Sequence, residues 1–247
     1  EQEMKQKLLP FFDERRANVE MIVLHSTAFE IDEALRLYEA REVSCHYFIG
    51  SGGDVWRLVE ESKRAWHAGK GQWRAITGDI NSCSIGIELA NSTLGQTDFG
   101  SIQKEALKKL LKDILHRYRI KPENIVGHSD MAPSRKADPG KAFFWKELAA
   151  EGIGLWPDLN DAVGWEENDP AELLGIIGYD TRDLGAAALA FCRRFLPEKV
   201  PEVSDVWALD ANPGRADDAF FEDEKFWRVL RAAAHKYRSE SSTPCRI

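Results

Sequence analysis

Residues 21–27 have the sequence MIVLHST and predict a strand that is buried on both faces of a sheet. We expect this strand to cover residues 19–27, with His25 close to its carboxyl end. A short apolar segment over residues 124–127 predicts another strand, and His128 follows it directly. Two histidines therefore lie at the carboxyl ends of two apolar strands, and this repetition favours a common function for both.

The order of the predicted elements indicates the fold class. Residues 84–90 alternate, with Ile85 and two further aliphatic side chains on one face and Glu88 on the other, which predicts a strand. Apolar residues recur at helical spacing over residues 101–118. Strands interleaved with helices predict an α/β fold with a mixed central β-sheet flanked by helices.

Three other segments have weaker patterns. We expect an irregular or helical lead-in over residues 1–18 and a hairpin over residues 46–59, where two β-prone runs flank a Gly-rich turn. Residues 63–81 contain few periodic apolar positions, so we predict a long surface loop there.

The length of 247 residues fits one large domain and one small domain. Residues 152–170 are rich in Gly, Pro, Asp and Asn and have the composition of a linker. Apolar helical faces beyond it predict three helices, over residues 171–178, 184–195 and 217–237. We therefore divide the chain into a larger domain, residues 1–157, and a segment of linker and small C-terminal all-α module, residues 158–247.

The loop at residues 127–140, with the sequence GHSDMAPSRKADPG, carries an imidazole, an ammonium and a carboxylate. His128 and Asp138 of this loop, together with His25, have the composition of an open zinc site with room for a water. Such a site predicts hydrolysis by a metal-activated water. Lys136 is placed to stabilise the negative charge that develops in that reaction.

Each of these residues also has an ordinary structural explanation. A lone histidine at a strand end is more often a core residue bonded to a backbone carbonyl, and Asp138 precedes a proline as turn aspartates commonly do. Only the combination supports a metal. Glu88 lies on a strand that we expect to be covered on both faces, where an unpaired carboxylate is costly, so a functional or paired role is favoured. It could accept a proton from the water or orient a metal ligand.

Composition narrows the class of protein. The formal net charge of −8 argues against nonspecific nucleic-acid binding, and no apolar run reaches the length of a membrane span. The four cysteines lack paired spacing, which favours free thiols over a disulfide framework. The chain begins Glu1-Gln2, so we expect that a native N-terminus has been removed, and a lipid anchor could have been lost with it. The motifs of serine hydrolases, zincins and phosphate-binding loops are absent from the sequence.

Five stretches, in this order, resemble the zinc-dependent N-acetylmuramoyl-L-alanine amidases of the type 2 amidase and peptidoglycan-recognition-protein superfamily. They are residues 23–27 (VLHST), 44–47 (SCHY), 64–69 (RAWHAG), 84–89 (SIGIEL) and 127–140 (GHSDMAPSRKADPG). Their order and combination are far more specific than any one of them.

The resemblance implies a role for each candidate residue. The zinc ligands would be His25, His128 and Asp138. Glu88 would be the general base or water-orienting carboxylate, and Lys136 would stabilise the oxyanion. The substrate cleft would be lined by His46, Tyr47, Trp66, His67, Trp73, Arg74 and Asn91.

The implied reaction is zinc-dependent hydrolysis of the amide bond between N-acetylmuramic acid, or its 1,6-anhydro form, and L-alanine in peptidoglycan or muropeptides. The layout is most similar to the periplasmic branch with a C-terminal peptidoglycan-binding module. We therefore expect a monomeric periplasmic enzyme of cell-wall turnover and muropeptide recycling, with an outer-membrane anchor as one option. Two alternatives stay open: a noncatalytic peptidoglycan-binding protein, and a cytoplasmic recycling amidase restricted to anhydro-muropeptides.

Overall fold

The computed structural model describes residues 4–162 and 167–241. The strands are β1 (Lys5–Gln6), β2 (Phe12–Glu14), β3 (Met21–Thr27), β4 (Tyr47–Ile49), β5 (Val55–Arg57), β6 (Lys63–Ala65), β7 (Lys70–Trp73), β8 (Ile76–Asp79), β9 (Ser84–Ala90) and β10 (Ile125–Gly127). The helices are α1 (Ile31–Arg41), α2 (Ile80–Cys83), α3 (Ser101–Arg117), α4 (His128–Met131), α5 (Trp145–Ala150), α6 (Pro170–Ile177), α7 (Leu184–Phe195), α8 (Ala208–Ala211) and α9 (Glu224–Ser241). Short 3-10 turns cover η1 (Pro122–Asn124), η2 (Leu159–Ala162), η3 (Pro197–Lys199) and η4 (Asp218–Glu222).

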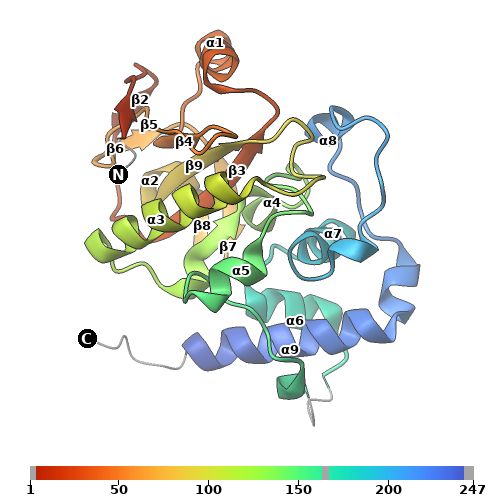
Figure 1. Cartoon of the computed structure of the whole chain (residues 1–247). Helices are drawn as coiled ribbons and strands as arrows, with labels where there is room; N and C mark the ends of the chain where they lie inside the picture. Colours follow the sequence, from red (N-terminus) through yellow and green to blue (C-terminus); the bar gives the residue numbers. More distant parts are fainter. Residues whose placement is uncertain (1–3, 163–166, 242–247) are drawn as a thin grey trace.

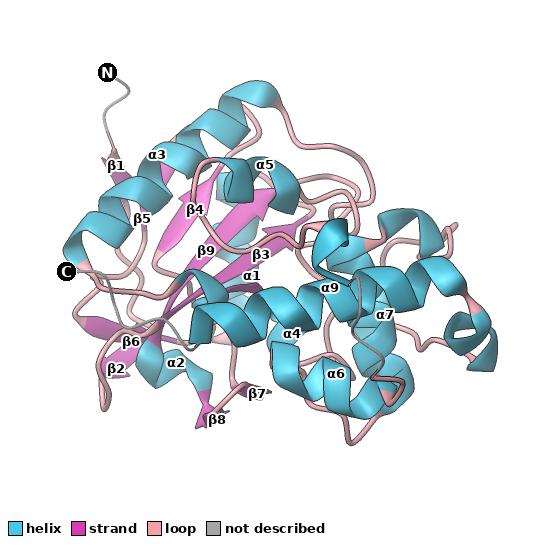
Figure 2. Cartoon of the chain, turned by 90° about the horizontal axis from the view of Figure 1, so that it is seen from below, coloured by secondary structure: helices cyan, strands magenta, loops and turns pink. Residues whose placement is uncertain are grey.

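A six-stranded sheet with the order β1-β5-β4-β9-β3-β10 lies at the centre (Figure 1). Strands β4, β9, β3 and β10 are parallel, whereas β5 and β1 run in the opposite direction. Figure 2 shows α3 and α5 to one side of this sheet, with α6, α7 and α9 gathered away from them. The mixed sheet with flanking helices confirms the predicted α/β class.

The alternation of β3 divides the apolar core. Ile22 and Leu24 pack with side chains of α3, whereas Met21 and Val23 pack with side chains of α6, α7 and α9. Because successive side chains of a strand point to opposite faces, His25 shares the face of Met21 and Val23. The imidazole thus lies on the side of the sheet that the C-terminal helices partly cover.

The C-terminal helices are joined to the sheet domain by a buried polar network as well as by apolar contacts. Asp130 accepts hydrogen bonds from Arg194 Nη1 at 2.7 Å and from the Tyr179 hydroxyl at 2.7 Å. The side chains of Asp130 and Arg194 are 2% and 1% exposed, so this ion pair is shielded from water. It ties α7 to the loop that carries His128.

Two sequence predictions were wrong because short strands form through pairing rather than through apolar periodicity. The lead-in over residues 1–18 contributes β1 and β2, which pair with β5 and β6. The segment 63–81 was expected to be a loop but contains β6, β7 and β8 and the start of α2. Strands β7 and β8 form a hairpin around Arg74, whose φ is +55°.

The last predicted helix begins later than expected. We placed it over residues 217–237, but α9 starts at Glu224 after η4. Asp223 Oδ1 accepts a hydrogen bond from the Phe226 backbone N–H at 2.8 Å, which satisfies a free donor of the first turn and fixes the start. Helix α8 has only four residues and was not predicted from the sequence.

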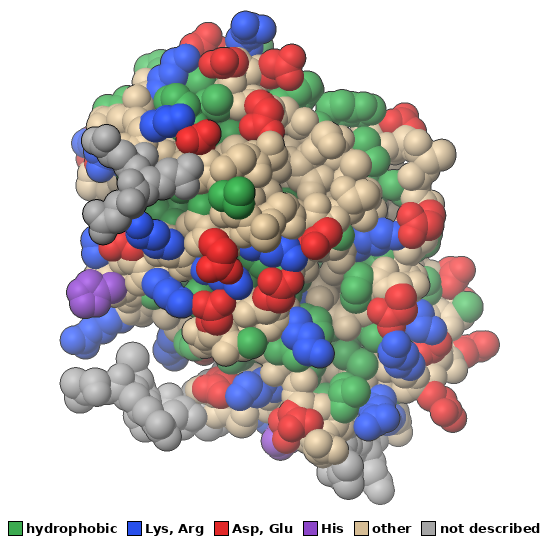
Figure 3. Space-filling view, viewed as in Figure 1, with side chains coloured by type: hydrophobic (Ala, Val, Ile, Leu, Met, Phe, Trp, Pro, Cys, Tyr) green, Lys and Arg blue, Asp and Glu red, His purple; other side chains and the backbone are tan. Residues whose placement is uncertain are grey.

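Within the described residues, no helix combines the length and the hydropathy needed to cross a bilayer. Cys45, Cys83 and Cys192 are buried free thiols, as expected, and Cys245 lies outside the described residues. Figure 3 shows acidic and basic side chains interspersed over the visible face rather than gathered by sign.

Candidate active site

Strand register brings three predicted residues to one place. His25 of β3 is directly paired with Glu88 of β9. On the other side of β3, Gly127 of β10 is paired with Leu24, so His128 follows at the level of His25. Parallel strands thus deliver two imidazoles and a carboxylate to the same edge, which is where open α/β sheets usually bind ligands.

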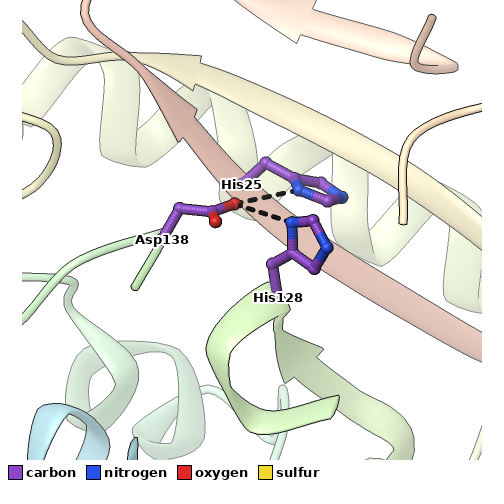
Figure 4. Close-up of side chains that lie close together, drawn as sticks. All are labelled: His25, His128 and Asp138. Carbon is purple, nitrogen blue, oxygen red and sulfur yellow. Dashed lines mark hydrogen bonds and ion pairs between the residues drawn. The ribbon is translucent and has the colours of Figure 1, made fainter. Parts of the chain in front are cut away.

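Asp138 completes a compact cluster with the two histidines (Figure 4). Its Oδ2 lies 3.0 Å from His25 Nδ1 and 3.2 Å from His128 Nδ1. One ligand atom from each residue lies within 4.8 Å of the others. Figure 4 shows His25 reaching in from β3, His128 from the start of α4 and Asp138 from the loop beyond it.

A chain of hydrogen bonds assigns the tautomer of His25. Ser84 Oγ donates its proton to the Ile80 carbonyl at 2.7 Å, so it can only accept from His67 Nε2, which lies 3.1 Å away. His67 Nδ1 therefore has a lone pair, and it accepts from His25 Nε2–H at 3.0 Å. His25 Nδ1 is left without a proton and faces Asp138.

His128 also has a hydrogen-bond partner that selects one of its tautomers. Its Nε2 lies 3.2 Å from the Ala68 carbonyl, which can only accept a hydrogen bond, so the proton resides on Nε2. In the neutral tautomer that this bond selects, Nδ1 is the nitrogen that faces Asp138 and is open to a metal. Two imidazole nitrogens and a carboxylate oxygen thus converge, an arrangement that suits a cation.

The pKa shifts of His25, His67 and Asp138 suit a metal site at this cluster. Burial lowers the pKa of His25 from 6.5 to about 4 in the protein without metal, although the nearby Asp138 carboxylate opposes the shift. Burial also lowers the pKa of His67 well below its usual value. For Asp138, burial would raise the pKa, but the two histidines outweigh it and the carboxyl stays ionised. Two histidines and one carboxylate are a typical ligand set of an open zinc site.

Glu88 and Lys136 line the cleft that lies over this cluster. The carboxylate of Glu88 lies near Tyr38, whose pKa is raised well above its usual value by burial first and by the charge of Glu88 second. The site therefore places a carboxylate and an ammonium around the cluster without occupying its ligand atoms.

The cleft has a volume of about 280 Å³ and is lined by two of the seven predicted substrate-binding residues, Trp66 and His67. His67 has a second contact besides its bond to His25, since its ring lies directly over Gly86. A Cβ at position 86 would meet the His67 ring at 2.4 Å, so only glycine fits there. Other residues that line the cleft were not predicted from the sequence, including Phe29, Tyr38, Arg41 and Trp207.

Five residues predicted to bind substrate do not line this cleft. Trp73 is completely buried, and its indole N–H donates to the Glu123 carbonyl. The Arg74 guanidinium donates to carbonyls at the end of α6. Neither side chain reaches the cleft, because the segment folds as a hairpin against the C-terminal helices instead of as an open loop.

The other three serve local structure. His46 is completely buried, where its Nδ1 accepts from the Gly86 N–H, and burial lowers its pKa to about 3. The Tyr47 hydroxyl donates to Glu61. Asn91 holds the turn after β9 by accepting from backbone N–H groups at positions 93 and 95.

A family model described as N-acetylmuramoyl-L-alanine amidase matches residues 15–141. The N-acetylmuramoyl-L-alanine amidase AmiD of Escherichia coli is 37% identical over 209 residues, which is 72% of this chain and 75% of AmiD. The 1,6-anhydro-N-acetylmuramyl-L-alanine amidase AmpD of the same organism is 40% identical over 104 residues, 42% of this chain and 55% of AmpD.

Solved structures agree with the sequence relatives. AmiD from Escherichia coli, in complex with the substrate anhydro-N-acetylmuramic acid-L-Ala-D-γ-Glu-L-Lys, superposes with a TM-score of 0.70 and 33% identity, covering 90% of this chain and 92% of AmiD. AmpDh3 from Pseudomonas aeruginosa gives a TM-score of 0.70 and 31% identity, covering 89% and 92%. On these matches, the chain belongs to the N-acetylmuramoyl-L-alanine amidase family.

Proposed function

We propose that this chain performs the amidase reaction of its family with a catalytic zinc ion held by His25, His128 and Asp138. The bond that it hydrolyses joins the lactyl group of N-acetylmuramic acid to L-alanine. The single observation that carries the zinc assignment is the convergence of three ligand atoms within 4.8 Å. A set of two histidines and a carboxylate leaves a fourth tetrahedral position open for water.

When bound, zinc would supply a Lewis acid that polarises the amide carbonyl and lowers the pKa of water toward about 7. We propose that Glu88 takes the proton of the attacking water and passes it to the leaving amine of L-alanine. Its register position beside His25 and its place in the cleft support this role. A positioned general base typically contributes on the order of 100-fold or more to the rate.

We propose that Lys136 stabilises the oxyanion. Its ammonium belongs to the same loop as His128 and Asp138 and lines the cleft. No hydrogen bond or ion pair joins this ammonium to another described residue, since Lys136 bonds only through its backbone N–H to the Ala132 carbonyl. A fixed positive charge at this point stabilises the tetrahedral oxyanion more than the planar amide, which is what lowers a barrier.

For the substrate, we propose muropeptides that carry anhydro-N-acetylmuramic acid, because the AmiD relative was solved with such a ligand. We also propose a periplasmic location, because the layout of the chain resembles the periplasmic branch with a C-terminal module. The match to AmiD extends into the C-terminal helices, whereas the match to AmpD covers 42% of the chain. The contribution of residues 158–247 to peptidoglycan binding stays a prediction. Cell fractionation tests the location, and recovery in the cytoplasm would contradict it.

Product analysis tests the reaction. The zinc-loaded protein is incubated with anhydro-N-acetylmuramyl-L-Ala-D-γ-Glu-L-Lys, and the products are identified by mass spectrometry. We expect anhydro-N-acetylmuramic acid and the free tripeptide, and we expect neither product from the Asp138→Ala variant. Cleavage at another bond would refute the proposed reaction, and undiminished hydrolysis by Asp138→Ala would refute the ligand assignment.

A further inference from the structure

The cleft over the metal cluster runs along α1. Phe29, two residues before the helix begins, and Arg41, the last residue of the helix, both line the cleft. The 11 residues of α1 rise about 16 Å. A substrate whose scissile amide lies at the cluster can therefore extend one part toward Phe29 and the other toward Arg41.

The Phe29 end is completed by an aromatic side chain from the C-terminal part of the chain. Trp207 lies immediately before α8, lines the cleft and is 51% exposed. Its ring centroid lies 5.5 Å from that of Phe29, at an interplanar angle of 35°. Figure 1 shows α8 beside the sheet and apart from α6 and α9, so this segment reaches across to the cleft.

The position of Trp207 is held by polar contacts of its own segment. Its backbone N–H donates to Asp205 Oδ1 at 3.0 Å, and Leu209, two residues further on, is buried. The backbone is thus fixed while half of the indole stays open to solvent. Together with Phe29 it presents an aromatic pair in the cleft that a ligand can reach.

The other end of the cleft has a different chemistry. Arg41 is exposed, and the hydrogen bonds and ion pairs of the described residues leave its guanidinium unpaired. This guanidinium suits a carboxylate, whereas the Phe29–Trp207 pair offers aromatic faces.

We propose that Phe29 and Trp207 form a sugar subsite, in which the muramic acid ring of the substrate stacks on the two aromatic rings. The inference rests on the proposed function and adds a direction: the sugar lies toward Trp207 and the acidic stem peptide toward Arg41. A pyranose ring is uncharged and has apolar C–H faces that pack on aromatic rings. The stem peptide of the AmiD ligand contains D-γ-Glu, whose carboxylate suits Arg41.

Calorimetric binding to zinc-loaded Glu88→Gln protein tests this subsite without turnover. The probes are anhydro-N-acetylmuramyl-L-Ala-D-γ-Glu-L-Lys and the same tripeptide without the sugar. We expect Trp207→Ala to raise the Kd of the sugar-bearing ligand about tenfold and to leave the Kd of the tripeptide unchanged, because one aromatic stacking partner is lost. Trp207→Phe keeps an aromatic face and should restore most of the affinity.

Two further variants fix the direction and the specificity of the effect. Arg41→Ala should weaken both ligands, because both carry the D-γ-Glu carboxylate. Ile102→Ala removes another exposed apolar side chain, 64% exposed and outside the cleft, and should change neither Kd. Equal effects of Trp207→Ala on both ligands, no effect on either, or an Arg41→Ala loss confined to the sugar-bearing ligand would each overturn the proposal.

Kinetics in the otherwise unmodified chain separate this inference from the proposed function. We expect Trp207→Ala to raise KM for the sugar-bearing substrate about tenfold with little change in kcat, since the lost contact binds the ground state and the transition state alike. A wild-type chain that binds both ligands as expected but releases no peptide would refute the hydrolysis and leave the subsite standing. Peptide release with equal KM in the two proteins would refute the subsite alone.

Discussion

The carbonyl oxygen of Ile80 is the first member of the hydrogen-bond chain that sets the tautomer of His25. Through Ser84 and His67 it places the proton of His25 on Nε2 and leaves Nδ1 free for a metal. The sequence identified His25, His128 and Asp138 as one site because their residue types and loop context are specific. It could not predict that His67 supports His25, because a hydrogen-bond partner 42 positions away leaves no local pattern.

Glu88 gives a prediction at the residue scale. The Glu88→Gln variant should bind zinc as tightly as the unmodified protein and lose at least about 100-fold in kcat, because it keeps the shape of the side chain and removes its basicity. Zinc content and steady-state kinetics check this. Glu105→Gln is the control, because Glu105 is an exposed residue of α3 and should leave kcat unchanged. Full activity of Glu88→Gln would exclude Glu88 as the base.

Strand β9 shows at the element scale how one residue without a side chain shapes the site. Gly86 provides the space for the His67 ring, and Glu88, two residues on, shares that face of the strand. The alternation of β9, its central position and the long helix α3 could be predicted from apolar periodicity. Strands β6, β7 and β8 could not, because three or four residues with little apolar content form strands only through their partners.

The Gly86→Ala variant tests this arrangement without removing any polar group. The added Cβ would meet the His67 ring at 2.4 Å, so the ring must move and the hydrogen bond to His25 Nε2 is lost. We expect zinc affinity to fall by about 10- to 100-fold, as is typical when a partner of a metal ligand is lost. Gly52→Ala, which meets no atom within 4 Å, is the matched control. Equal zinc affinity of Gly86→Ala and the unmodified protein, measured by chelator competition, would show that His67 does not support the site.

At the scale of the whole molecule, the C-terminal helices and the sheet share a core. Leu173, Phe191 and Tyr237 pack in the same apolar cluster as Met21 and Val23 of β3. Composition predicted a helical C-terminal module, but the shared core could not be predicted because apolar helical faces do not reveal what they pack against. We propose that the described C-terminal residues, 167–241, fold together with the catalytic domain rather than as a tethered binding module.

The buried ion pair between Asp130 and Arg194 gives a prediction about how the C-terminal helices are held to the sheet domain. Arg194→Met should lower the free energy of unfolding by about 3 kcal/mol or more, because it leaves the Asp130 carboxylate buried without its cation. Arg182→Met removes an exposed partner of Asp180, 85% exposed, and should lower the stability far less, because solvent screens that pair. Urea denaturation of both variants checks the difference. Equal stabilities would mean that the C-terminal helices do not depend on this network.

Buried histidines should also make the metal-free protein sensitive to acid. The pKa of His25 is lowered to about 4 and that of His46 to about 3, mainly by burial, and that of His67 is lowered as well. The folded chain therefore binds fewer protons than the unfolded chain below pH 6.5, and stability present above that pH is lost as the pH falls. The slope should approach about 4 kcal/mol per pH unit for three such groups. Denaturant titrations from pH 7 to pH 5 measure it, and a flat profile would contradict the neutral assignments.

The zinc dependence of peptide release tests the central claim most directly. Zinc is titrated into metal-free protein, and release of the tripeptide from anhydro-N-acetylmuramyl-L-Ala-D-γ-Glu-L-Lys is measured at each addition. We predict activity that rises in proportion to zinc and reaches its maximum at one ion per chain, as three converging ligand atoms require. Full activity before any zinc is added, or no activity at any zinc content, would contradict the account.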